Sequence, residues 1–178
     1  MVVNKILGFL FLWFIFSCEN KNDNFEKRYF DLVGFLNKQI KLLDHSKVKK
    51  TWMLDSAFET KNLKNLNWEK EFALFMQSDI NKKAFLQSYS VIKKENSLEY
   101  NLKNKEDLPV KKIRIDFNDR KEVYKIEIVK KVENYLYSSN VSLNIITKNG
   151  KIESYSMDNN QKVIFGTMKH SFIKGEIL

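Results

Sequence analysis

The sequence predicts an α+β fold in which two amphipathic helices pack on one face of a curved antiparallel β-sheet. Three observations predict this fold. Apolar residues recur every three to four positions in the first part of the chain, they alternate with a period of two from about residue 84 onward, and the predicted strands are joined by short connections. Short connections favour an antiparallel meander, here of about six to eight strands. Each helix and the sheet would have one apolar face, and these faces are buried most simply when the helices pack against the sheet.

Two segments have helical periodicity. The first helix is predicted to begin near Phe25, with Asp23 as its N-cap, and to end near Asp44. The second is predicted from Trp68 to about Ile80. Between them, residues 47–54 are typical of a strand, and residues 59–67, which are rich in Lys and Asn, are expected to form a loop.

The rest of the chain is predicted to form strands. Asn149-Gly150 is the strongest hairpin signal, because a type I′ turn needs positive φ at both central residues. The single proline, Pro109, is expected in a turn at the start of a strand. The predicted strands are 85–94, 98–102, 113–117, 122–132, 135–147, 151–157, 162–167 and 171–177.

The N-terminus has the layout of an export signal. Lys5 precedes an apolar run from Ile6 to Phe16, which is shorter than the roughly 20 apolar residues that span a bilayer. We therefore expect residues 1–17 to be a signal peptide, residues 18–24 a lipidated tether and residues 25–178 a single α+β domain. A plain secretory signal with an accidental cysteine and a buried helix are the alternatives.

The end of this run, Ile15-Phe16-Ser17-Cys18, resembles the lipobox of bacterial lipoproteins, although Phe16 is bulkier than the usual residue. The resemblance implies that Cys18 is lipidated and that the protein is held in the cell envelope, at the outer membrane, by its lipid anchor. Two or three acyl chains anchor a protein stably, where one chain does not. Since Cys18 is the only cysteine, no disulfide forms within the chain.

The chain is basic, with a formal net charge of +9. Only Arg28, Arg114 and Arg120 are arginines, and the lysines are dispersed. Arginine is the better residue for phosphate recognition, so this composition favours a solvated surface, and we expect no nucleic-acid partner.

No catalytic, cofactor or metal-binding pattern is recognisable. His45 and His170 are the only histidines, and neither belongs to a metal-ligand spacing. Two carboxylates could converge in space, but no spacing singles out a pair among Asp55, Glu59, Asp79, Asp107, Asp116 and Asp119. The aromatic residues could line a groove, but at these positions they are more often core: Trp52, Trp68, Tyr89, Tyr100, Tyr135, Tyr137 and Tyr155. A ligand site would lie where the helices leave the sheet uncovered.

Four segments of the chain resemble an uncharacterised lipoprotein family of the Bacteroidetes. They are Tyr29-Phe30-Asp31-Leu32 with Gln39-Ile40, Asp79-Ile80-Asn81-Lys82, the run from Glu133 to Ser139, and Gln161-Lys162-Val163. The resemblance implies an envelope location and assigns no activity, cofactor or site residue.

Two hypotheses for the function follow. The first is a non-enzymatic binding or structural module of the envelope, with a protein, lipid or glycan partner. The second is a hydrolase that uses two carboxylates on envelope material. A lipid carrier with an apolar cavity is a further member of the first class, and enzymatic activity remains open.

Overall fold

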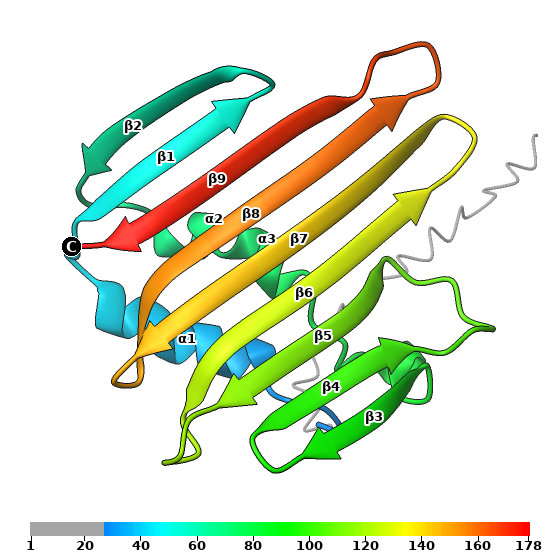
Figure 1. Cartoon of the computed structure of the whole chain (residues 1–178). Helices are drawn as coiled ribbons and strands as arrows, with labels where there is room; N and C mark the ends of the chain where they lie inside the picture. The colour runs from blue at the N-terminus through cyan, green and yellow to red at the C-terminus, as the bar shows by residue number, and fades with distance from the viewer. Residues whose placement is uncertain (1–26) are drawn as a thin grey trace, which may run out of the picture.

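The computed structural model describes residues 27–178, which form one open, nine-stranded antiparallel sheet with a few short helices on one of its faces (Figure 1). The fold is therefore mostly β. Nine strands is more than the six to eight expected for the meander and equals the number of segments predicted individually as strands. The helical layer is smaller than predicted. The signal and tether residues, including Cys18, lie outside the described residues.

The sheet is a meander with a hairpin added at one side. The strand order is β2-β1-β9-β8-β7-β6-β5-β4-β3, so strands β3 to β9 follow one another and the β1–β2 hairpin pairs with β9. The strands are β1 (Val48–Leu54), β2 (Ala57–Leu63), β3 (Tyr89–Lys94), β4 (Ser97–Leu102), β5 (Val110–Phe117), β6 (Val123–Glu133), β7 (Tyr137–Lys148), β8 (Lys151–Val163) and β9 (Lys169–Ile177).

The turns of the sheet gather at two ends. The β1–β2, β6–β7 and β8–β9 turns lie together at one end, which we call the hairpin-tip end (Figure 1). The β5–β6 and β7–β8 turns lie at the opposite end. At the β7–β8 turn, Asn149 and Gly150 have φ values of 51° and 75°, which confirms the predicted hairpin.

Alternation along the strands gives the sheet an inner face toward the helices and a polar outer face. Ile113, Ile115, Ile126 and Ile128 are buried on the inner face. Leu143, Ile145 and Tyr155 on the neighbouring strands β7 and β8 are buried on the same face. The core is therefore a filled layer between the helices and the sheet, not an enclosed apolar calyx.

Helix α1 (Leu32–Leu43) begins later than predicted. Its N-cap is Asp31, whose carboxylate accepts a hydrogen bond of 2.8 Å from the Gly34 amide. A side chain at Gly34 would collide with that carboxylate, which explains the glycine inside the helix. The buried amide of Gln39 joins the helix to the β7–β8 hairpin, because it donates to the Gly150 carbonyl and accepts from the Ile152 amide.

The predicted second helix is divided. Helices α2 (Trp68–Glu71) and α3 (Ala73–Met76) are separated at Phe72, and a 3-10 turn, η1 (Lys83–Phe85), follows them. Trp68, Phe72 and Phe75 are nevertheless all buried. The periodicity thus identified the buried side correctly, while the prediction of one continuous helix is wrong.

Two predictions about strands are also wrong. The segment expected as a loop, 59–67, mostly forms β2, an edge strand that is exposed along almost its whole length. The segments 151–157 and 162–167 do not form separate strands, because β8 runs without interruption from Lys151 to Val163.

Candidate functional site

The helices cover only part of the inner face, and the part near the hairpin tips is left open (Figure 1). Ile128 and Leu143 are buried beneath the helices, whereas the next inner residues along the same strands, Lys130 and Val141, are partly exposed. Beyond them, Tyr137 is exposed. The edge of the helical layer therefore crosses the sheet between these positions.

An apolar hollow of about 340 Å³ lies on this open part, over β1, β2 and β9. Trp52 is directly opposite Ile173 across the β1–β9 pair, and Leu54 is opposite Ala57 across the β1–β2 turn. Leu54 is 61% exposed although its side chain is apolar. The lining residues are Trp52, Met53, Leu54, Ala57, Phe58, Glu59, Ser171 and Ile173. Concave sites with a mostly apolar lining are the usual form of small-molecule sites.

A strip of partly buried apolar side chains runs from this hollow toward a basic position, and it is interrupted by two polar residues, Ser171 and Asn159, which lie in the row between Leu54 and Val141. Ile173 is opposite Met157 on β8, and Val141 on β7 is opposite Lys130 on β6. Adjacent strands are about 4.8 Å apart, so the four steps from β1 to β6 place Lys130 about 19 Å across the sheet from Leu54. The strip is comparable in length to an extended fatty acyl chain.

Lys130 contributes to a second, smaller hollow of about 170 Å³. Its other lining residues include Lys82, Phe85 and Val110. Burial, together with the positive charge of Lys82, lowers the pKa of Lys130 below its usual range. Within residues 27–178 neither lysine has a carboxylate in ion-pair distance. Asp79 lines the same hollow, so the two lysines share it with one acidic residue.

A buried polar cluster lies next to the hollow, between α2 and the sheet. Lys50 Nζ is 2.7 Å and 2.8 Å from the two carboxylate oxygens of Glu71, and the Tyr155 hydroxyl donates to Glu71 at 2.7 Å. Lys50 Nζ also lies 5.8 Å from the centroid of a Trp52 ring. Burial and the Glu71 carboxylate raise the pKa of Tyr155 far above its usual range, so this phenol stays protonated. The cluster holds α2 on the sheet and orients the floor of the hollow.

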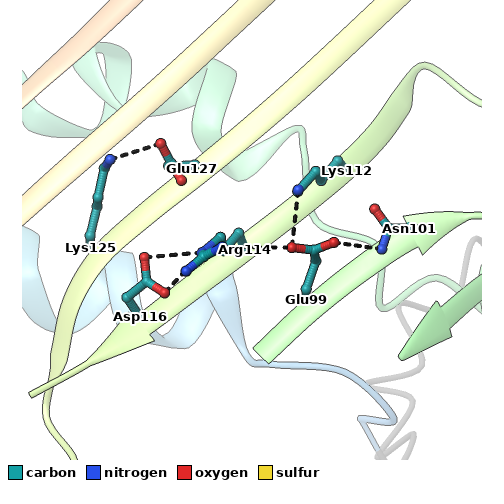
Figure 2. A network of polar contacts seen from close by, with 7 residues as sticks. All are labelled: Glu99, Asn101, Lys112, Arg114, Asp116, Lys125 and Glu127. Atoms are coloured by element: carbon teal, nitrogen blue, oxygen red, sulfur yellow. Dashed lines mark hydrogen bonds and ion pairs between the residues drawn. The ribbon is translucent and has the colours of Figure 1, made fainter. Parts of the chain in front are cut away.

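The outer face carries a network of charges that neutralise one another (Figure 2). Glu99 binds Lys112 at 3.0 Å and accepts from Asn101 at 2.8 Å, and these contacts lower the pKa of its carboxyl group. Arg114 binds Asp116 at 2.9 Å. Lys125 and Glu127 form a further pair at 2.8 Å. The Glu99–Lys112 pair crosses from β4 to β5, and the other two pairs lie within one strand each; together they neutralise the charges drawn on this solvated face.

The carboxylates singled out from the sequence do not converge. Asp55 lies in the β1–β2 turn beside Lys169, Glu59 pairs with Lys61, and Asp107 pairs with Lys111. Asp79 accepts from Asn81, Asp116 belongs to the outer-face network, and Asp119 is exposed in the β5–β6 turn. Hydrogen bonds from the His170 amide and Lys169 lower the pKa of Asp55, the opposite of what a general acid needs.

The two histidines are also far apart. His45 follows α1 and lies near Asp44, whereas His170 begins β9 and contacts Asp158 at 3.1 Å. Because Val48 pairs with Ile177 and Leu54 with Ser171, the histidines flank opposite ends of β1, roughly 20 Å of strand apart. Among residues 27–178 no group of three or more His, Cys, Asp or Glu side chains could hold a metal ion.

The seven aromatic residues divide into three groups. Trp68, Tyr89, Tyr100 and Tyr155 are core residues, as the more common interpretation predicts. Trp52 lines the apolar hollow, and Tyr135 and Tyr137 are exposed at the β6–β7 turn. Sequence reasoning missed the contribution of β2 to the hollow. The sequence offered one signal for this contribution, which is the presence of apolar residues, Leu54 and Phe58, on both sides of a turn.

No helix within the described part of the chain is both long and apolar enough to cross a membrane. The chain matches no protein-family model, no curated protein and no solved structure.

Proposed function

We propose that this protein is a lipid-anchored module of the bacterial cell envelope, and that it binds the acyl chain of an amphipathic lipid or fatty acid on the open part of its inner face. The observation that carries the proposal is the apolar hollow at Trp52, Leu54 and Ile173, from which a partly apolar strip runs across the same face toward Lys130. The envelope location and the lipidation of Cys18 rest on the lipobox-like sequence.

Two features favour a lipid over a protein or glycan ligand. The lining of the hollow is mainly apolar, whereas a glycan site would need several convergent polar groups. The basic position at the other end of the strip suits the carboxylate or phosphate of a lipid. An acyl chain in the hollow would remove Leu54 and Trp52 from water, and burying such side chains favours binding.

A hydrolase that uses paired carboxylates is disfavoured. It requires two acids at one site, one of them with a raised pKa. The six acids considered are dispersed over separate turns and strands, most of them beside cationic groups.

The test uses tryptophan fluorescence of the fragment 19–178, whose only tryptophans are Trp52 and Trp68. Trp68 is 5% exposed in the core, so a quencher in the hollow acts mainly on Trp52. We expect 9,10-dibromostearate to quench the fluorescence saturably, and Trp52→Phe to remove that quenching. Leu54→Asp should weaken binding at least about tenfold, because a charge would enter the apolar lining.

Leu42→Asp is the matched control, because Leu42 is 48% exposed on α1, away from the hollow. It should bind dibromostearate like the wild type. Lys130→Met should weaken the binding of dibromostearate and leave the binding of the corresponding alcohol unchanged. Quenching that is absent, or equal in Leu54→Asp and Leu42→Asp, would overturn the proposal.

A further inference from the structure

Exposed apolar side chains are concentrated on two neighbouring hairpin tips. At the β6–β7 turn, Tyr135 is 81% exposed and Leu136 49%. At the β8–β9 turn, Ile164 is 52% exposed and Phe165 97%. Turns are usually polar, and a group of exposed apolar residues of this kind marks an interaction surface. We call these four residues the tip patch.

The backbone holds the tip patch in one arrangement. The Ile164 amide donates a hydrogen bond of 2.8 Å to the Leu136 carbonyl, so the two turns are joined directly. Asn134 Oδ1 accepts from the amides of Leu136 and Tyr137 and fixes the β6–β7 turn. The two turns are therefore held side by side before any partner binds, which reduces the backbone entropy that would be lost on docking.

The charge around the patch is positive. From Asn159 to Gly175 the chain contains three lysines and no acidic residue. Lys162 and Lys169 stand on either side of the β8–β9 turn. Lys169 is paired with Asp55 at 3.2 Å, whereas Lys162 has no ion pair among residues 27–178. This arrangement suits a membrane surface. Apolar side chains of a protein insert among the acyl chains, tyrosines favour the interface, and lysines lie near anionic headgroups.

We infer that the tip patch docks on an anionic lipid surface, with Phe165 and Ile164 inserted between headgroups and Lys162 beside the phosphates. The inference is independent of the proposed acyl-chain site and of the lipid on Cys18. Docking in this orientation places the hollow over β1, β2 and β9 at the same end of the molecule as the membrane (Figure 1).

The experiment measures flotation of the fragment 19–178 with vesicles. This fragment lacks Cys18, and it retains the whole described core, which begins at Tyr29; far-UV circular dichroism checks that each variant is folded. Vesicles of phosphatidylcholine alone are compared with vesicles that also contain phosphatidylglycerol. We expect binding to the anionic vesicles, with weaker binding at high salt because the lysine contribution is screened.

Phe165→Asp should reduce the partition coefficient at least about tenfold, because a fully buried phenylalanine side chain contributes one to two decades to such an equilibrium. Tyr124→Asp is the matched control, since Tyr124 is 53% exposed at the start of β6, next to the β5–β6 turn and far from the tip patch. Lys162→Glu should weaken binding to anionic vesicles only. Lys151→Glu, at the first residue of β8 beside the β7–β8 turn, should leave binding unchanged.

An environment-sensitive dye on Thr167→Cys reports insertion directly. Its emission should shift to the blue on anionic vesicles, whereas the same dye on Lys151→Cys should not respond. The inference is overturned if the fragment binds no vesicles, or if Phe165→Asp binds as the wild type does. It is also overturned if the patch instead mediates dimers that Phe165→Asp dissociates.

Discussion

At the scale of single residues, Gly175 is a position where any side chain would collide with the core. It lies opposite Tyr155 in the β8–β9 pair, and a Cβ there would collide with the Tyr155 ring. That ring cannot move aside, because it packs edge-on against Trp68 and Phe72 and its hydroxyl is bonded to Glu71. The glycine is therefore required by the close approach of a ring, not by its backbone conformation.

We expect Gly175→Ala to lower the free energy of unfolding by about 1–3 kcal/mol, the usual cost of overpacking a core. Guanidinium unfolding of the fragment 19–178 measures this. Gly166→Ala is the control, because its nearest neighbour is the side chain of Val163, which is 47% exposed and can rotate. Equal stability of Gly175→Ala and the wild type would show that the ring is less constrained than the contacts indicate.

At the scale of elements, the spacing of apolar residues predicted which side chains are buried, but it did not predict where a helix is interrupted. Trp68, Phe72 and Phe75 keep helical spacing and are buried, but the backbone turns out of the helix at Phe72, where φ is −94° and ψ is 7°. Strand β2 could not be recognised, because an exposed edge strand shows no alternation between apolar and polar residues. The meander and its hairpin at Asn149-Gly150 follow from local signals and were predictable.

For the candidate site, too, one part was predictable from the sequence and another was not. That a site would lie where the helices leave the sheet uncovered was predictable from the size of the helical segments. The hollow itself depends on which residues of β1, β2 and β9 are paired, and the pairing of β1 with β9 joins strands more than 100 residues apart. No local pattern in the sequence encodes that contact.

Helix α2 has only four residues, too few to be stable alone, so its place depends on tertiary contacts: the burial of Trp68 and the ion pair of Glu71 with Lys50. The side chains of Lys50 and Glu71 are only 14% and 11% exposed. Lys50→Met leaves a buried carboxylate without its cation and should cost about 3 kcal/mol of unfolding free energy. The double variant Lys50→Met/Glu71→Leu should recover part of that loss, because no buried charge remains.

A double-mutant cycle measured by guanidinium unfolding tests this coupling. Lys125→Met is the control. It breaks an outer-face pair with Glu127 whose side chains are 33% and 38% exposed, and exposed pairs contribute about 1 kcal/mol or less. If Lys50→Met were no more destabilising than Lys125→Met, the cluster would not be what holds α2 in place.

At the scale of the whole molecule, the two ends of the sheet differ in character. The helices and the filled core stabilise one part, while the hairpin-tip end carries the hollow, the tip patch and most of the exposed apolar surface described above (Figure 1). Stability and binding are thereby separated along the strands. The long strands β6 to β9 extend past the helices and connect the two regions rigidly.

The proposed anchor and the tip patch should contribute to membrane association by very different amounts. Acyl chains on Cys18 would hold the protein against a carbonate wash, because two or three chains bury many methylene groups. The tip patch alone gives a weak and reversible contact. In cell fractionation we therefore expect Cys18→Ser to leave the membrane on washing, and Cys18→Ser/Phe165→Asp to be absent from the membrane even before it. If Cys18→Ser still resisted the carbonate wash, anchoring through Cys18 would be refuted, whatever the vesicle experiments show for the tips.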